Sequence, residues 1–117
     1  MPYAIIDGDD VGVKIEAHIL ANDVESFKKT SALITQSIES LVSELEITPG
    51  IDVISHGGDS ILARVESSQT ATISEILSAK QKPGQFTFSV GIGEDLRQSF
   101  IALRMAKSSG KRKVVVY

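Results

Sequence analysis

The sequence contains no cysteine, which excludes disulfides and thiolate metal sites. A metal ion would therefore bind through oxygen atoms or through His18 and His56, the two histidines present. A basic excess is also missing, because 12 lysine and arginine residues stand against 15 acidic residues and the net charge is −3. General electrostatic attraction to nucleic acid, and direct DNA binding with it, is therefore not expected.

Long apolar runs are absent as well. No stretch approaches the roughly 18 residues of a membrane span, and the first residues lack the basic-then-apolar order of a signal peptide. We therefore expect a cytoplasmic protein. The composition, with 42% hydrophobic and 23% charged residues, is that of an ordinary globular protein. We expect residues 1–117 to form a single domain with its own core.

Hydrophobic periodicity predicts the elements of the first half. A short buried strand is expected over residues 2–6. Residues 11–20 carry apolar side chains at every second position, which is typical of a strand or of a strand followed by a turn. A long helix should follow, capped by Asn22 with Glu25 three residues on, and Pro49-Gly50 should end it.

The second half begins with a predicted hairpin. Residues 51–56 and 60–66 favour strands, and Gly57-Gly58 between them suits a tight turn. A second helix is expected from a capping box of Thr72 and Glu75, and Pro83-Gly84 should stop it.

A strand, a helix and a closing strand complete the pattern. Residues 86–90 alternate as a half-buried strand. Glu94 and Asp95 suit a helix N-terminus, and Gly110 suits the C-cap of that helix. Residues 114–116 should form the last strand. The order β-α-β-β-α-β, followed by α-β, predicts an α+β fold of the ferredoxin-like kind, with helices covering an antiparallel sheet.

Two short acidic loops stand out in this pattern: Asp7-Gly8-Asp9-Asp10 after the first strand and Gly57-Gly58-Asp59-Ser60 in the hairpin. A right-handed crossover makes the first two strands parallel, and the third strand can fill the gap between them. Asp7 and Asp59 should therefore be neighbours at one end of the sheet. Paired carboxylates of this kind suit Mg²⁺, which is commonly held by one or two carboxylates and substrate phosphates.

Four motifs follow one another along the chain: Ile6-Asp7-Gly8-Asp9-Asp10-Val11-Gly12, Gly57-Gly58-Asp59-Ser60, Phe88-Ser89-Val90-Gly91-Ile92-Gly93 and Ala106-Lys107-Ser108-Ser109-Gly110-Lys111. In this order they resemble the palm-domain nucleotidyl cyclases. That group includes GGDEF diguanylate cyclases, the palm domains of type III CRISPR polymerases and the minimal CRISPR polymerases (mCpol). The short chain and the first motif are most similar to mCpol.

The resemblance implies an enzyme that uses Mg²⁺ or Mn²⁺ to join nucleoside triphosphates with release of pyrophosphate. It implies that Asp7 and Asp59 are catalytic metal ligands, with the Gly8 carbonyl as a third oxygen. The loop formed by Asp9, Asp10, Val11 and Gly12 would offer backbone N–H groups to phosphates. The remaining implied nucleotide contacts are Gly57 and Gly58, which leave room for the nucleotide, Ser60, and the basic pair Lys107 and Lys111.

The chain also departs from the group. Ser60 stands where many cyclases have a second acid, so Asp9 and Asp10 remain open as replacement ligands or as solvated turn residues. Ile15 stands where diguanylate cyclases place a guanine-reading asparagine, which argues against a preference for guanine. The resemblance to the CRISPR polymerases, which use ATP, implies ATP as the substrate and a cyclic oligoadenylate such as cyclic di-AMP as the product. We interpret His56 as an exposed strand residue and His18 as structural or solvated.

Several functional expectations follow from the resemblance. Joining two nucleotides calls for a second bound nucleotide, so a homodimer with facing sites is expected. The family is associated with phage defence, and its product is thought to control a membrane-associated effector. Ser60 also keeps open a catalytically degenerate nucleotide sensor. A plain interaction module that binds no nucleotide is the third alternative.

Overall fold

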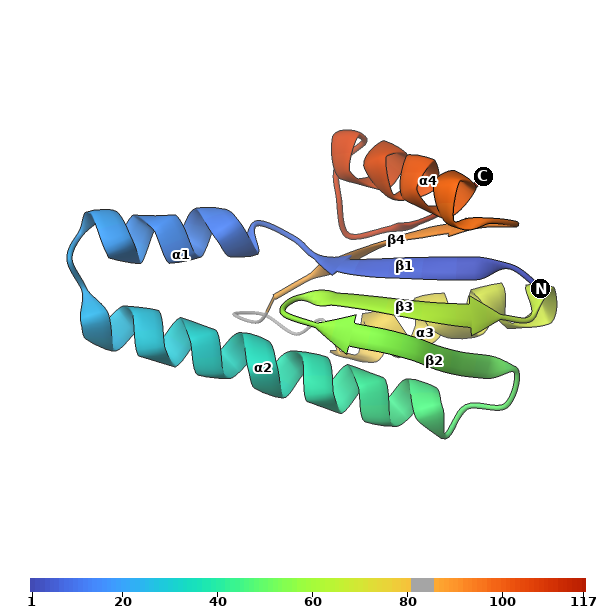
Figure 1. Ribbon diagram of the computed structural model, residues 1–117, viewed down its shortest axis with the longest axis horizontal. Coiled ribbons are helices and arrows are strands. Elements are labelled where there is room, and N and C mark those ends of the chain that lie inside the picture. The colour runs from blue at the N-terminus through green and yellow to red at the C-terminus, as the bar shows by residue number, and fades with distance from the viewer. Residues whose placement is uncertain (81–85) are drawn as a thin grey trace.

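The computed structural model describes residues 1–80 and 86–117, which form five strands and four α-helices besides one short 3₁₀ turn (Figure 1). In chain order these are β1 Tyr3–Gly8, α1 Val11–Leu20, α2 Val24–Glu46, β2 Ile51–Gly57, β3 Ser60–Val65, the 3₁₀ turn η1 Ser67–Gln69, α3 Thr70–Lys80, β4 Phe88–Gly93, α4 Leu96–Ser108 and β5 Val114–Val116. Within the described ranges, no helix is both long and apolar enough to cross a membrane.

The strands form one sheet in the order β2-β3-β1-β4-β5. β3 pairs antiparallel with both β1 and β2, and β1 pairs antiparallel with β4. The first four strands therefore have the predicted ferredoxin-like arrangement, and the α+β prediction is confirmed. The added strand β5 pairs with β4 in the parallel direction, so the sheet is not antiparallel throughout.

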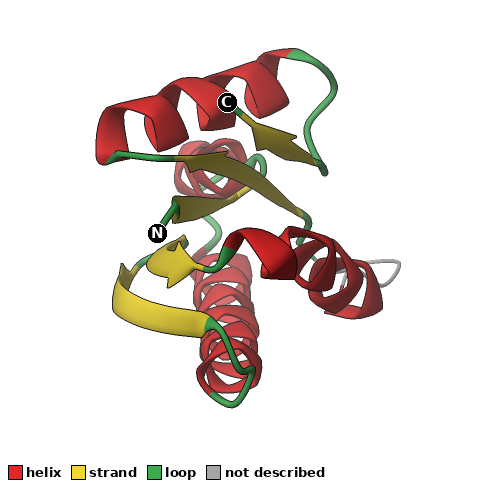
Figure 2. Ribbon diagram, turned by 90° about the vertical axis from the view of Figure 1, so that its right-hand side faces the viewer, coloured by secondary structure: helices red, strands yellow, loops and turns green. Residues whose placement is uncertain are grey.

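The hydrophobic core lies on one face of the sheet. Along β1 the side chains alternate, and Ala4 and Ile6 are fully buried while Ile5 and Asp7 on the opposite face are only partly covered. Helices α2 and α3 cover the core face with Ile38, Leu41, Val42, Leu45, Ile73 and Leu77. Helix α4 packs on the other face, where the Ser99 hydroxyl donates to the Tyr3 carbonyl at 2.7 Å. Figure 2 shows α4 and α2 on opposite sides of the sheet.

Residues 11–20 form the helix α1, so the predicted strand is wrong. The apolar residues Val11 and Ile15 are one helical turn apart and are partly covered. His18, one further turn along, shares a 2.9 Å hydrogen bond between its Nε2 and Thr30 Oγ1 of α2. Val13 and Ile19 lie on exposed positions instead, and together the covered and the exposed apolar residues produce the alternating pattern. Helix α1 and the first half of α2 extend together beyond the sheet as an arm (Figure 1).

The predicted helix caps hold in one case and fail in others. Asp23, not Asn22, caps α2, because the Ser26 N–H donates to Asp23 Oδ1 at 3.0 Å and Asn22 is in the left-handed region at φ 54°. Thr72 lies inside α3, which begins two residues earlier at Thr70 after η1, so it is not a cap. Asp95 does cap α4, as its carboxylate accepts from the N–H of Gln98 at 2.8 Å.

Two predicted helix ends remain. Helix α2 ends at Glu46, before Pro49-Gly50. The C-cap of α4 is Ser109, one residue before the predicted Gly110, which follows it with φ 113°. The predicted stop at Pro83-Gly84 lies outside the described residues.

Candidate active site at the end of β1

The two acidic loops meet at one end of the sheet. In the β1–β3 pairing Asp7 lies opposite Ser60, and the Gly8 N–H donates to the carbonyl of Asp59 at 2.9 Å. The convergence expected from topology is therefore present. It arises because β3 lies between β1 and β2, which puts the hairpin turn beside the end of β1.

The carboxylates of Asp7 and Asp59 are both half-buried and lie near each other in the site. Ser60 Oγ donates to Asp7 Oδ1 at 2.5 Å, which fixes one oxygen and leaves Oδ2 toward the other groups of the site. Asp59 approaches the backbone of Gly8 so closely that a Cβ added there would lie 3.2 Å from Asp59 Oδ2. Burial, and then the negative charge of Asp7, raise the pKa of Asp59. Two carboxylates that repel each other in this way favour a cation between them.

Asp9 has a different environment, because its side chain is buried and saturated with hydrogen bonds. Oδ1 accepts from Ser89 Oγ at 2.7 Å and from Lys107 Nζ at 2.9 Å. Oδ2 accepts from Thr87 Oγ1 at 2.7 Å and from the Arg112 N–H at 3.1 Å. A carboxylate offers about four acceptor positions, so all of them are engaged.

This environment corrects the predicted role of Asp9. The Asp9 N–H, expected to face phosphate, donates to the Thr87 carbonyl at 2.9 Å. Burial raises the pKa of the Asp9 carboxyl, but hydrogen bonds from Ser89, Lys107 and Thr87 outweigh that effect and hold the pKa below its ordinary value. Asp9 is therefore an ionised anchor rather than a free ligand.

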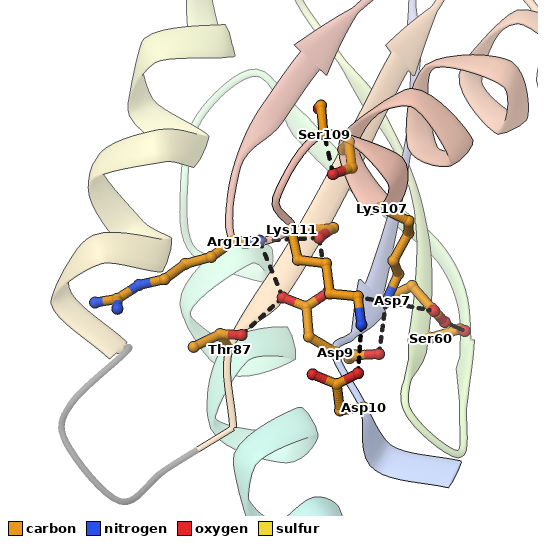
Figure 3. A network of polar contacts seen from close by, with 12 residues as sticks. Asp7, Asp9, Asp10, Ser60, Thr87, Lys107, Ser109, Lys111 and Arg112 are labelled. Carbon is orange, nitrogen blue, oxygen red and sulfur yellow. Dashed lines mark hydrogen bonds and ion pairs between the residues drawn. The ribbon is translucent and has the colours of Figure 1, made fainter. Parts of the chain in front are cut away.

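The Lys107 ammonium lies at the centre of the acidic cluster (Figure 3). Its Nζ donates to the Gly8 carbonyl at 2.7 Å and to Asp9, and it forms an ion pair with Asp7 Oδ2 at 3.1 Å. Burial lowers the pKa of Lys107, yet its hydrogen bonds to Asp9 and Asp7 outweigh burial and raise it, so the amine stays charged. The family resemblance implied that Lys107 contacts a triphosphate. In the structure it contacts two of the predicted metal ligands, Gly8 and Asp7.

The other predicted basic residue, Lys111, forms an ion pair with Asp10 at the rim. It belongs to a turn in which Gly110, Lys111 and Arg112 all have positive φ. This unusual backbone is held by Asp9 and by Ser89 Oγ, which accepts from the Arg112 N–H at 3.1 Å. The Arg112 side chain points away from the carboxylates (Figure 3).

Sequence reasoning missed the groups that bind the Asp9 carboxylate. These are the side chains of Thr87, just before β4, and of Ser89 within it, and the backbone N–H of Arg112. One signal was available, because Ser89 interrupts an otherwise apolar strand and proves to be fully buried. A buried polar side chain needs a partner, and here that partner is a carboxylate. The left-handed turn at Lys111 and Arg112 carried no comparable signal.

The N-terminus of α1 also opens on the site. Asp10 precedes the helix in the left-handed region at φ 59°, and its side chain makes no capping hydrogen bond. The first-turn N–H groups, which include those of Val11 and Gly12, therefore have no side-chain cap. A helix N-terminus of this kind binds anions such as phosphate. Val11 and Gly12, predicted to contact phosphate from a loop, lie instead in the first turn of a helix.

A cleft of about 560 Å³ adjoins Asp59. It lies between the two helices of the arm and the hairpin turn, and its volume is in the range of small-ligand sites. Gly57 and Gly58 line one side, and nothing lies within 4 Å of a Cβ added at either glycine. The lining residues on the helices are Val11, Ile15, Phe27, Ser31, Ile34, Thr35, Ile38 and Glu39, and His56 completes the hairpin side.

The donor set fits a magnesium ion that also binds substrate. Across the described parts of the chain there is no group of three or more acidic or histidine side chains that could hold a metal by itself. Asp7, Asp59 and the Gly8 carbonyl offer hard oxygen ligands at one place. Magnesium usually completes such a partial set with phosphate oxygens and water.

Comparisons with known proteins agree with this geometry. A family model described as "mCpol: minimal CRISPR polymerase domain" matches residues 3–117. No curated protein sequence matches at a significant level.

Solved structures share the fold at low sequence identity. The coiled-coil and GGDEF domain of DgcB from Caulobacter crescentus, in complex with c-di-GMP, has a TM-score of 0.71 and 19% identity over 99% of this chain and 69% of that chain. The diguanylate cyclase SiaD from Pseudomonas aeruginosa, bound to its activator SiaC, has a TM-score of 0.65 and 18% identity over 99% of this chain and 49% of that chain. A Csm1–Csm4 cassette in complex with pppApA has a TM-score of 0.63 and 19% identity over 97% of this chain and 20% of that chain.

Proposed function

Because the chain belongs to the minimal CRISPR polymerase family, we propose that it is a metal-dependent nucleotidyltransferase that joins ATP into a cyclic di- or oligonucleotide. The observation that carries the proposal is the meeting of the two acidic loops, where Asp7, Asp59 and the Gly8 carbonyl converge beside a cleft of about 560 Å³. Oxygen atoms from separate strands thus lie together beside a cavity, an arrangement that would suit a cation and a nucleotide.

Each part of the site suits one part of a nucleoside triphosphate. The cleft between the arm and the hairpin would hold the base and ribose. The α1 N-terminus and Lys111 would contact the phosphates, and Lys107 would be close enough to contact the phosphates as well. Asp7, Asp59 and the Gly8 carbonyl would hold Mg²⁺ or Mn²⁺, which would lower the pKa of the attacking hydroxyl and neutralise phosphate charge.

The substrate preference is part of the proposal. Ile15 lines the cleft and offers no hydrogen bond to a base. The polar side chains of the same lining are those of Ser31, Thr35, Glu39, His56 and Asp59. We propose ATP as the substrate and a cyclic oligoadenylate as the product, used in anti-phage defence through an effector that responds to it.

The direct test is incubation with each nucleoside triphosphate in Mg²⁺ or Mn²⁺, with mass spectrometry of the products and a pyrophosphate assay. We expect a cyclic adenine nucleotide and pyrophosphate from ATP. If no nucleotide mixture yields either, the enzymatic proposal is rejected.

A nucleotide sensor is the second candidate, favoured by Ser60 in place of an acid. In the structure its hydroxyl binds Asp7, so it orients a ligand without adding a charge. A sensor would bind ATP in calorimetry without consuming it, whereas turnover in the same sample would exclude this candidate.

A further inference from the structure

Lys107 occupies the cation position of the site. Its Nζ lies 2.7 Å from the Gly8 carbonyl and 3.1 Å from Asp7 Oδ2. These atoms belong to two of the three groups proposed above as metal ligands. The ammonium thus neutralises the acidic cluster that a divalent cation would neutralise.

A hydrogen bond to Asp9 fixes the ammonium group of Lys107 in this position. Asp9 Oδ1 accepts from its Nζ at 2.9 Å, and Asp9 itself is fixed by Ser89, Thr87 and the Arg112 backbone. The side chain of Lys107 is only 23% exposed, so these oxygens replace most of the water around its ammonium group.

An ammonium and a divalent cation cannot share the same oxygens at full strength. Magnesium lies about 2.1 Å from its oxygen ligands, so its binding to Asp7 and Gly8 would bring a second positive charge close to Nζ. Like charges at such a distance repel in a half-buried site. Lys107 must therefore give up part of its contacts when the metal binds.

We propose that Lys107 acts as a resident cation that makes divalent-metal binding depend on nucleotide. A bound triphosphate supplies new acceptors for the ammonium and also supplies the oxygen ligands that Asp7, Asp59 and Gly8 lack. The scarcity of acidic ligands in the described chain points the same way independently. This inference rests on the proposed function, because it assumes that the same site takes metal and nucleotide.

The coupling is reciprocal by thermodynamic necessity. If nucleotide raises the affinity for the metal by some factor, the metal raises the affinity for nucleotide by the same factor. The protein would then take up metal and triphosphate together, and the acidic cluster would not hold a divalent cation unproductively between turnovers.

The test measures metal binding alone, without turnover. Mn²⁺ is titrated into the protein with and without a non-hydrolysable ATP analogue, and free Mn²⁺ is followed by electron paramagnetic resonance. For the unaltered protein we expect the analogue to tighten Mn²⁺ binding at least about tenfold. Equal affinity with and without the analogue would overturn the proposal, whatever the variants do.

Two lysine variants separate the effect of this position from general charge. Lys107→Gln should bind Mn²⁺ alone several-fold more tightly than the unaltered protein, and the effect of the analogue should shrink. Lys80→Gln removes a lysine whose Nζ donates to Ser40 of α2 and for which no contact with Asp7 or Gly8 is seen, so its Mn²⁺ affinity without nucleotide should not change. Unchanged Mn²⁺ affinity in a folded Lys107→Gln protein would contradict the proposal.

The outcome is separable from that of the proposed function. Product formation from ATP together with nucleotide-independent Mn²⁺ binding would leave the enzyme assignment intact and reject the role of Lys107. Coupled binding of Mn²⁺ and analogue without any product from ATP would support the role of Lys107 and reject the enzyme assignment.

Discussion

Asp7, Asp9 and Asp59 are carboxylates at the same end of the sheet, and their surroundings separate their tasks. Asp59 is half-buried and has Asp7 as a neighbour of like charge, which raises its pKa. Asp9 is surrounded by donors, which lower its pKa. Burial and a like charge thus disfavour the ionised form of Asp59, whereas hydrogen bonds stabilise the ionised form of Asp9.

The first prediction at the residue scale concerns Asp59. Replacing it with asparagine removes a charged metal ligand and the source of much of the repulsion, but keeps the size of the side chain. We expect the rate of cyclic product formation to fall at least about 100-fold. The thermal midpoint should change little, because Asp59 forms no ion pair in the described chain. Normal turnover by a folded Asp59→Asn protein would contradict its role as a ligand.

A second residue-scale prediction concerns Asp9 and stability. Asp9→Asn replaces charge-assisted hydrogen bonds to Lys107 and its neighbours, so we expect a loss of about 2 kcal/mol in the free energy of unfolding at pH 7. Urea denaturation followed by circular dichroism measures it. Asp10→Asn is the matched control, because that residue is exposed and its ion pair contributes at most about 1 kcal/mol.

The pH dependence of this loss has a defined sign. The folded-state pKa of Asp9 is depressed, so its ionised form stabilises the fold above the unfolded-state pKa of about 4. That stabilisation disappears as the pH falls through the lower, folded-state value. The stability difference between the unaltered protein and Asp9→Asn should therefore shrink below about pH 4, and a constant difference would refute the assignment.

At the scale of elements, the short strands and the hairpin follow from sequence patterns, whereas α1 does not. Strands β1, β2 and β3 lie where runs of β-branched and apolar residues predict them. The strand predicted in place of α1 is wrong because Val13 and Ile19 are apolar yet exposed, which imitates the period of a strand. A hydrogen bond between His18 and Thr30 connects α1 to α2. It joins residues twelve positions apart, so a local sequence pattern cannot reveal it.

Two glycines give an element-scale prediction with opposite signs. A Cβ at Gly91 would lie 2.1 Å from the Ser99 carbonyl oxygen, because α4 packs directly on β4 there. Gly91→Ala should therefore destabilise the protein by several kcal/mol or prevent folding. A Cβ at Gly12 meets nothing within 4 Å, so Gly12→Ala in the first turn of α1 should add about 0.5–1 kcal/mol of stability.

The same Gly12 variant tests the function of the helix end. If phosphates approach the first-turn N–H groups closely, the added methyl group should weaken binding of the ATP analogue while the thermal midpoint rises. Differential scanning fluorimetry gives the midpoint, and calorimetry gives the affinity. Unchanged affinity in the stabilised variant would place the phosphates elsewhere.

At the scale of the whole molecule, the topology predicted from the order of elements brings the two acidic loops together, as the structure confirms. The place of β3 between β2 and β1 brings together residues 52 positions apart, Asp7 and Asp59. What topology could not supply is which oxygens are free. The last hydrogen bond to Asp9 comes from the Arg112 N–H in a left-handed turn at Gly110 to Arg112, whose conformation no sequence pattern predicts.

The proposed homodimer also belongs to this scale. The chain offers a cleft beside its acidic pair for one nucleotide, and a second copy would bring the second nucleotide to face it. We expect sedimentation velocity to show a dimer in the presence of ATP analogue and metal, and turnover per protein molecule to fall on dilution. A monomer that keeps full specific activity at every dilution would contradict the facing-site arrangement.

The central claim is that Asp7, Gly8 and Asp59 form a metal site completed by a triphosphate. A crystal grown with Mn²⁺ and a non-hydrolysable ATP analogue tests it most directly, because manganese gives an anomalous signal. We predict a peak about 2.1 Å from oxygens of Asp7 and Asp59, with phosphate oxygens in the same coordination shell and Lys107 moved onto the triphosphate. A bound analogue with no anomalous peak between these two carboxylates would contradict the account.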